Sequence, residues 1–310
     1  MTIHIGNAPC SWGSLEFEGL EKGITCDQML DELVETGYKG TELGDWGFMP
    51  TEPAALRETL SSRGLTMLGA FVPGDFKDAA CHDAVRDETL KIARLIAAVQ
   101  DTGDETYSPY IVLADNNGTV PERTQNAGRV TPAMGLTEDE WKVYGQGVDK
   151  VAQAVRDETG LRCVFHHHCA GYVETPDEIR MLLSVTNPKL VGLVFDAGHY
   201  AFGSGTPTHE CVMDGLEEYA NRVCYLHFKD CQHEVAARAK AEGWDYFKSV
   251  AEGVFCELGK GCVDFSKIKT WIDQHGYEGW ICVEQDVLPG MGVPRESAGR
   301  NREYLKNIGL

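Results

Sequence analysis

Several features that would each place a chain in a familiar class are missing from this sequence. None of its apolar runs reaches the roughly 18 residues that a membrane-spanning helix requires, so we expect no membrane span. The opening segment MTIHIGNAPCSWG has no basic stretch followed by an apolar one, so a secretory signal is not expected either. No Gly-x-Gly-x-x-Gly pattern follows the first strand-like run, although dinucleotide-binding sheets carry this signature there.

Positive charge and paired cysteines are also scarce. Lysine and arginine together number 28 against 48 aspartates and glutamates, and the formal net charge of −20 would repel a phosphate backbone. We therefore expect no nucleic-acid partner. The 11 cysteines include no Cys-x-x-Cys pair, and Cys163, Cys224 and Cys282 lie inside apolar runs. This usage is typical of reduced thiols in a cytoplasmic protein, not of a disulfide framework.

The sequence does contain a repeated alternation of short strand-like runs and amphipathic segments. The runs are rich in β-branched and aromatic residues and are bounded by turn residues. We predict strands at Ile3–Pro9, Tyr38–Gly44, Leu65–Val72, Tyr110–Asp115, Arg162–His168, Val191–Ala197, Val223–Asp230 and Trp280–Asp286.

The segments between these runs have apolar residues at helical spacing, and several end in glycine, as in CDQMLDELVETG and EPAALRETLSSRG. This alternation predicts an α/β fold, a parallel (β/α)8 TIM barrel with outer helices; the alternative is a doubly wound open sheet. No linker or low-complexity segment interrupts the pattern, so residues 1–310 are expected to form one domain. Two longer insertions, at roughly residues 115–136 and 230–262, are expected to be lids or binding loops.

The predicted strands end in side chains that bind metals or exchange protons. In a barrel of this kind the active site lies at the carboxyl ends of the strands, so these side chains are expected to share one face. Polar residues placed on a surface by chance would not gather at the ends of the strands. The strand-end side chains are Glu42, Asp115, His166, His168, Asp196, His199, His227, Lys229, Asp230, Glu284 and Asp286.

Three of the ten histidines stand in a row within the run FHHHC. Side chains at positions i and i+2 of a strand point to the same side. His166 and His168 are therefore expected to face the barrel interior, and His167 to face the helices.

The last four predicted strands end in His166, Asp196, His227 and Glu284. Two imidazoles and two carboxylates without a thiolate are unlike a structural zinc site and suit Mn²⁺, Co²⁺, Fe²⁺ or Zn²⁺. We predict that these four residues hold one divalent ion. Mn²⁺ or Co²⁺ is favoured, with Zn²⁺, Fe²⁺ or Mg²⁺ as alternatives.

A family resemblance covers nearly the whole chain. It rests on NAPCSWG, GTELGDWGFMPTEP, FHHHCAG, FDAGHYAFGSGTP, YLHFKD, and LGKGCVDF followed by GYEGWICVEQD. These stretches resemble the xylose isomerase-like barrels, within them the sugar phosphate isomerase/epimerase group, and most of all the inosose (2-keto-myo-inositol) dehydratases.

The resemblance implies one divalent ion held by Glu, Asp, His and Glu. Asp196, His227 and Glu284 match three of these ligands by position, whereas His166 stands where the isomerases have their first Glu. The isomerases use that Glu with the last one to move a proton across two faces of a sugar. Its replacement by histidine is unlike an epimerase and resembles the dehydratases.

The activity implied is that of a hydro-lyase that dehydrates a cyclic keto-polyol through an enediolate. A base that works near neutral pH must remove the proton next to the ketone, and His168 is our candidate. Glu42, His199 and Lys229 are candidates for the acid that protonates the departing hydroxyl.

Four further residues are candidates for substrate binding. Asp115 and Asp230 are expected to accept hydrogen bonds from substrate hydroxyls, and Trp12 to form an apolar wall. Arg295 follows the loop GMGVP and either reaches the site or pairs with Glu296. The expected substrate is a small cyclic keto-polyol or a ketose, and the assembly is left open as a homodimer or homotetramer.

Four other functions compete with this hypothesis. A sugar isomerase or epimerase acting on a ketose would share the metal, and a lyase acting on 3-keto-glycosides would share metal and base. A barrel nuclease needs several zinc ions and a basic groove, against which the net charge counts. A protein that holds the metal without chemistry would not need the ring of acid–base residues.

Overall fold

The computed structural model describes residues 3–13, 24–100, 103–288 and 290–310. Within these residues a closed barrel of parallel strands forms in the order β1-β10-β7-β6-β5-β4-β3-β2, and β1 pairs with both β10 and β2. The predicted α/β barrel is confirmed. Its strands are β1 Ile3–Asn7, β2 Gly40–Glu42, β3 Thr66–Gly74, β4 Tyr110–Asp115, β5 Arg162–His166, β6 Val191–Asp196, β7 Val223–Phe228 and β10 Gly279–Val283.

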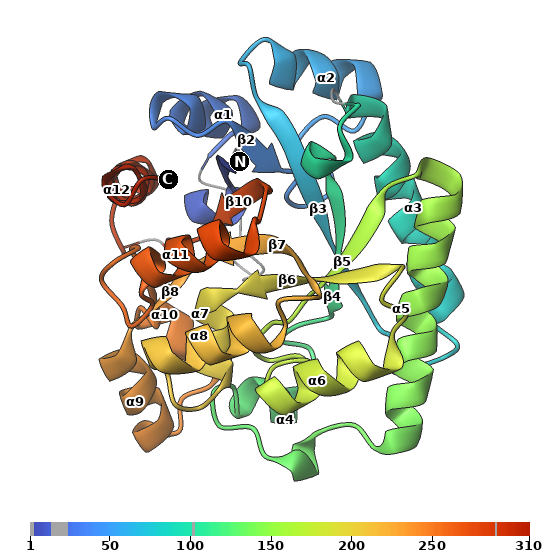
Figure 1. The fold of residues 1–310 in the computed structure, drawn as a ribbon, viewed down its shortest axis with the longest axis vertical. Coiled ribbons are helices and arrows are strands. Elements are labelled where there is room, and N and C mark those ends of the chain that lie inside the picture. The colour runs from blue at the N-terminus through green and yellow to red at the C-terminus, as the bar shows by residue number, and fades with distance from the viewer. Residues whose placement is uncertain (1–2, 14–23, 101–102, 289) are drawn as a thin grey trace.

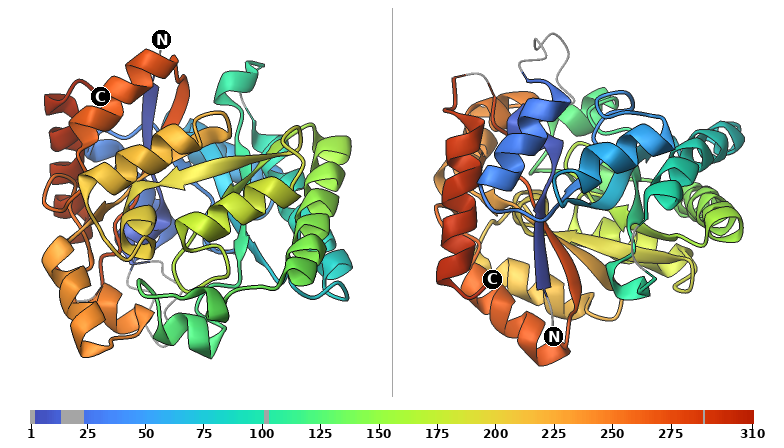
Figure 2. Two further views of the ribbon diagram at one scale, coloured as in Figure 1. Left: turned by 60° about the horizontal axis from the view of Figure 1, so that its bottom comes forward. Right: turned by 90° about the horizontal axis from the view of Figure 1, so that it is seen from above.

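Helices surround the barrel (Figure 1), and the views in Figure 2 place the strands inside this ring. The last helix packs beside the first and closes the ring. They are α1 Cys26–Glu35, α2 Pro53–Ser61, α3 His82–Val99, α4 Pro121–Gln125, α5 Glu138–Thr159, α6 Pro176–Val185, α7 Ala197–Gly203, α8 His209–Glu218, α9 His233–Glu242, α10 Tyr246–Ala251, α11 Phe265–His275 and α12 Pro294–Asn307. None of the helices in the described part is long and apolar enough to cross a membrane.

The two insertions are more ordered than the sequence suggested. The first contains α4, and the second contains α9, α10 and a small antiparallel sheet formed by β8, Asp230–Cys231, and β9, Phe255–Cys256. Helices α7 and α8 were also missed. The first turn of α7 is capped by Asp196, whose Oδ1 accepts the backbone N–H of His199 at 2.8 Å, so a strand-end residue starts the helix directly.

Strand alternation separates two apolar cores. A small core fills the barrel interior, and a larger one joins the outer strand faces to the helices. Val112, Val164, Val194 and Cys282 lie in the inner core, whereas Leu113, Phe165 and Phe195 lie in the outer one. The pairing of β5 ends at His166 and that of β7 at Phe228, so His166 and His227 lie in the sheet and His168 and Lys229 just beyond it.

Candidate metal and acid–base site

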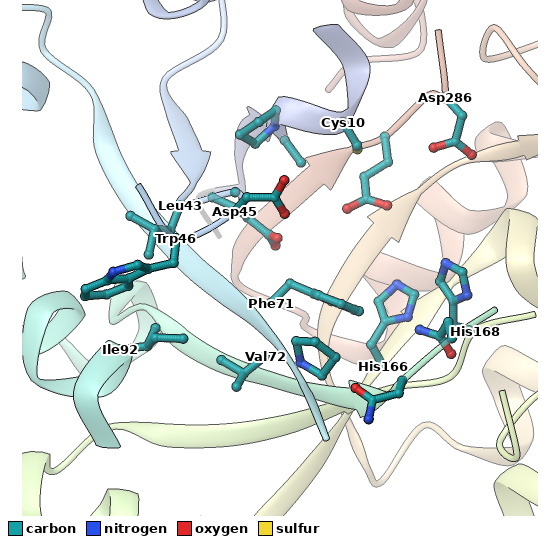
Figure 3. A pocket seen from close by; sticks show the side chains of 18 of the residues that line it. Cys10, Leu43, Asp45, Trp46, Phe71, Val72, Ile92, His166, His168 and Asp286 are labelled. Atoms are coloured by element: carbon teal, nitrogen blue, oxygen red, sulfur yellow. The ribbon is translucent and has the colours of Figure 1, made fainter. Parts of the chain in front are cut away.

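The carboxyl ends of the strands surround a cavity of about 510 Å³. Figure 3 shows His166 and His168 at one end of it and Trp46 and Ile92 at the other. The polar end is lined by Glu42, His166, His168, Lys229, Glu284 and Asp286. The cavity therefore lies on the face where the sequence predicted the site.

The row of three histidines alternates as expected. His166 and His168 line the cavity, whereas the ring of His167 packs against Phe195 and Tyr200 on the helix side. His167 Nε2 accepts the backbone N–H of Asp196 at 3.2 Å, so this histidine is tied into the framework. The outward orientation predicted for His167 is confirmed.

The four residues predicted to hold a metal come together. Each of His166, Asp196, His227 and Glu284 offers one ligand atom, and these atoms lie within 4.8 Å of one another. His166 Nε2 lies 3.6 Å from Asp196 Oδ2, and His227 Nδ1 lies 3.2 Å from Glu284 Oε1. All four side chains are buried.

These side chains also fit a cation chemically. Asp196 Oδ2 and His227 Nδ1 are buried atoms without a hydrogen-bond partner, as is Nδ1 of His166. Buried polar atoms are normally paired, because an unpaired one costs about 1–3 kcal/mol. A divalent ion would satisfy the oxygen and the imidazole lone pair together.

His227 is held in the orientation that metal binding requires. Its Nε2 lies 3.0 Å from Glu42 Oε1, and the Tyr225 hydroxyl donates to the same oxygen at 2.9 Å. With a proton on Nε2, Nδ1 faces Glu284 and is the nitrogen that a cation can reach once it displaces the second proton. Carboxylates that accept the second N–H of a ligating histidine commonly fix its tautomer in this way. Glu42 thus contacts His227 and Tyr225, and no ion pair joins it to Lys229 in the described residues.

A second cluster overlaps the first and contains Glu42, His227, Cys282 and Glu284. Burial raises the pKa of the Cys282 thiol well above its usual value, so the thiolate that binds metals does not form readily. Glu42 already accepts two hydrogen bonds. The cluster with His166 and Asp196 is therefore the better candidate.

The charges of the cluster favour a cation. Burial raises the pKa of Glu284, but His227 and Lys229 outweigh this and hold it well below its usual range. Burial lowers the pKa of His227, yet the carboxylates of Glu284 and Glu42 raise it to about 10. A proton thus occupies His227 when no ion is bound, and a metal must displace it.

His168 presents a lone pair to the cavity. Its Nδ1 lies 2.6 Å from the carbonyl oxygen of Cys169, so Nδ1 donates there and Nε2 is left unprotonated, 3.4 Å from the Tyr246 hydroxyl. Burial, then the neighbouring His166 and Lys229, lower the pKa of His168 well below its usual value. The turn after His168 favours glycine at position 171, because a Cβ there would lie 2.5 Å from Asn117 Oδ1 and 3.0 Å from Asp115 Cβ.

Lys229 and His199 contact each other next to His168. Lys229 Nζ is 3.3 Å from Glu284 Oε2, 3.3 Å from Asp286 Oδ2 and 3.2 Å from His199 Nε2. Burial lowers the pKa of Lys229, but Asp286 and Glu284 raise it well above its usual value, so Nζ stays an ammonium. The ring of His199 packs against that of His168 at a tilt of 36°, with centroids 3.8 Å apart, and is not part of the cavity lining.

Two aspartates expected to bind substrate point away from the cavity. Asp115 accepts hydrogen bonds from the Tyr144 hydroxyl and from the backbone N–H groups of Tyr172 and Val173. Asp230 accepts four backbone N–H groups, those of Cys231, Gly259, Gly261 and Val263, at 2.8–3.0 Å. Both aspartates follow the outward-facing positions of their strands, so they hold loops in place.

Trp12 and Arg295 also lie elsewhere. Trp12 is buried in the outer core, where its indole N–H donates to Glu32 Oε2 of α1 at 2.9 Å. Arg295 is half exposed at the start of α12 and pairs with Glu35 at 2.8 Å. It pairs with neither of the two partners expected from the sequence, the site and Glu296.

Several lining residues were not among our candidates. No residue pattern distinguishes them: Asp45, Trp46, Asn116 and Asn117 lie in the loops after β2 and β4, and Tyr246 and Phe247 begin α10. Asn117 carries the clearest signal: both polar atoms of its amide are buried without a hydrogen-bond partner. Only the folded structure reveals this.

Comparison with known proteins agrees with this geometry. Residues 30–308 match the family model described as xylose isomerase-like TIM barrel. The chain is 32% identical over 307 residues to an inosose dehydratase of Geobacillus kaustophilus, covering 99% of this chain and 94% of the relative. It is 30% identical over 304 residues to that of Clostridium beijerinckii, covering 98% and 96%.

Solved structures share the fold at low identity. The probable 3-DHS dehydratase AsbF from Bacillus anthracis superposes with a TM-score of 0.68 at 12% identity, with 98% of this chain and 99% of that one covered. The 3-keto-D-glucoside 4-epimerase YcjR from E. coli gives 0.65 at 14% identity, with 99% of both chains covered. By its matched residues and by its relatives, the chain belongs to the xylose isomerase-like TIM barrel family.

Proposed function

We propose that this protein is a metal-dependent hydro-lyase that removes water from a cyclic keto-polyol of the inosose type. The observation that carries the proposal is the juxtaposition of a neutral imidazole, His168, with the cluster of His166, Asp196, His227 and Glu284 in one cavity. The full-length similarity to inosose dehydratases supports it.

His166, Asp196, His227 and Glu284 would hold the ion, and their mixed nitrogen and oxygen donors favour Mn²⁺ or Co²⁺. When bound, the ion supplies Lewis acidity that makes the proton next to a ketone easier to remove. Glu42 and Tyr225 position His227.

The proton is taken by His168. Its Nε2 accepts the proton of the C–H bond next to the ketone, while Nδ1–H remains bonded to the Cys169 carbonyl. The electron pair of that bond forms the new double bond as the β-hydroxyl departs. The Lys229 ammonium, kept charged by Asp286 and Glu284, donates the proton that makes the departing group water. His199 contacts both His168 and Lys229 and is proposed to position them.

Asn117 is proposed to replace the aspartates as a binder of substrate hydroxyls. Its buried amide offers one acceptor and one donor group without partners, which suits a hydroxyl that both donates and accepts. Lys229 is the one lysine or arginine among the described residues of the lining, and carboxylates already neutralise it. A neutral polyol therefore fits this cavity better than a sugar phosphate.

The alternative is a sugar isomerase or epimerase that uses the same ion. The experiment that separates the two combines a keto-inositol or a ketose with the protein and Mn²⁺ or Co²⁺ in D₂O. A dehydratase forms a product that lacks one water and absorbs in the ultraviolet. Deuterium incorporated into a substrate that keeps all its oxygens would instead identify an epimerase or isomerase.

A further inference from the structure

The cavity extends well beyond the residues that the proposed reaction uses. Its far end, which we call the apolar arm, is formed by Leu43, Trp46, Val72 and Ile92. Figure 3 shows these side chains opposite His166 and His168, with Phe71 between the two ends. The arm comes from the loop after β2, the end of β3 and the middle of α3.

The arm is built to present an apolar surface. Leu43, Val72 and Ile92 are buried, but the indole of Trp46 is 40% exposed. Lys91 Nζ lies 4.1 Å above the Trp46 ring and pairs with Glu88 at 2.7 Å, so a cation packs against one face of the indole. An exposed aromatic ring next to aliphatic side chains gains free energy when an apolar group covers it.

The size of the cavity also exceeds the needs of one ring. Six CHOH units, each comparable to the share of a water molecule in the liquid, roughly 30 Å³, occupy about 180 Å³. The cavity measures about 510 Å³. A ring at the metal cluster would leave the arm empty.

The charges at the arm limit what can fill it. Asp45 and Glu88 lie at its rim and are exposed, and Leu43, Val72 and Ile92 offer no side-chain hydrogen bonds. The Lys91 ammonium offsets the carboxylate of Glu88, so the carboxylate of Asp45 is the charge that remains to repel a phosphate or carboxylate. A second polyol would lose hydrogen bonds to water there.

We infer that the natural substrate is a keto-polyol ring bearing an uncharged, apolar substituent, such as an ether- or glycoside-linked aryl group, and that this substituent occupies the apolar arm. The inference rests on the proposed function for the ring and adds the class of group attached to it. It makes Trp46 a specificity-determining residue of the same cavity.

The test compares two substrates that differ only in the substituent: a keto-inositol and its phenyl ether, each with Mn²⁺. Covering the indole should give the phenyl ether about a tenfold lower KM than the free ring. Trp46→Ala should remove this preference by raising KM for the phenyl ether alone, and Trp46→Phe should restore part of it. Val34→Ala, which truncates another exposed apolar side chain that does not line the cavity, should change neither KM.

Calorimetry with the phenyl ether of the unoxidised inositol provides a second readout that needs no turnover. Binding that depends on Trp46 supports the arm even if neither ketone loses water, in which case the proposed reaction is wrong and the inferred ligand class stands. Equal KM values for the two ketones, an equal effect of Trp46→Ala on both, or tighter binding of a polar disaccharide would overturn the inference. So would a loss of self-association in Trp46→Ala, because a second copy would then cover the arm.

Discussion

Asp196 ends β6 and Asp230 lies two residues beyond the end of the neighbouring strand β7. Both have an exposed fraction of zero, yet their surroundings are opposite. Asp196 gives one oxygen to the N–H of His199 and leaves Oδ2 without a hydrogen bond. Asp230 uses both oxygens for four backbone N–H groups. Of these two buried aspartates, one thus has an oxygen available to a cation and the other holds a loop. The unpaired Oδ2 of Asp196 distinguishes them.

The largest effect should follow the loss of His168. His168→Ala removes the proposed base, so turnover should fall by roughly 10²–10⁴ while the metal content stays that of the wild type. Elemental analysis beside turnover measures both, and exchange of the substrate proton with solvent should fall in parallel.

His166→Ala is the matched control for this substitution. It removes a proposed ligand, so the metal content should fall and excess metal should restore part of the activity by mass action. If His168→Ala lost the metal and His166→Ala kept it, the two roles would be exchanged.

The next largest effect tests the two aspartates directly. Asp230→Ala leaves four N–H groups without acceptors, which at about 1 kcal/mol each should lower the free energy of unfolding by about 3–4 kcal/mol. The folded fraction should still bind metal. Urea unfolding and metal content, measured on the same sample, test both statements.

Asp196→Ala should show the reverse pattern. Metal binding should be lost, whereas the metal-free protein should lose much less stability than Asp230→Ala does. Equal losses of stability in the two variants would mean that unpaired atoms do not distinguish a site from a structural anchor here.

His167→Ala should have a smaller effect and only on stability. The substitution removes the acceptor of the Asp196 N–H and the packing against Phe195 and Tyr200, which should cost about 1–2 kcal/mol. Turnover per folded molecule should stay near wild type. A loss of turnover as large as that of His168→Ala would contradict the role of His167 as an outward-facing residue.

Much of the fold and part of the candidate site could be predicted from the sequence, because both depend on local periodicity. The alternation of strands and helices gave the barrel, and the period of two along β5 separated His167 from its neighbours. The same period, applied to Leu113 and Phe228, would also have placed Asp115 and Asp230 outside the cavity. The positions of Trp12 and Arg295 and the role of Asn117 depend on contacts between distant segments, which no local pattern records.

The smallest effect concerns another carboxylate whose hydrogen bonds are satisfied, on the loop that Asp230 also holds. Glu257 contacts Ser297, Arg300 and Lys260 at 2.6–3.0 Å and so joins this loop to α12. Burial raises its pKa, but these partners outweigh burial and lower the pKa from 4.5 to about 2. Because the folded pKa lies below the unfolded one, the stability that Glu257 contributes is fully present above about pH 4.5. It is lost as the pH falls toward 2.

The arginine and lysine that contact Glu257 are more than half exposed, so solvent screening reduces this contribution to about 1 kcal/mol. Glu257→Gln should therefore be less stable than wild type by this amount at pH 7, and the difference in free energy of unfolding should shrink toward zero as the pH falls through about 2. Urea unfolding of both proteins across this range measures it, and a difference that stayed constant with pH would show that the contacts of Glu257 do not depend on its charge.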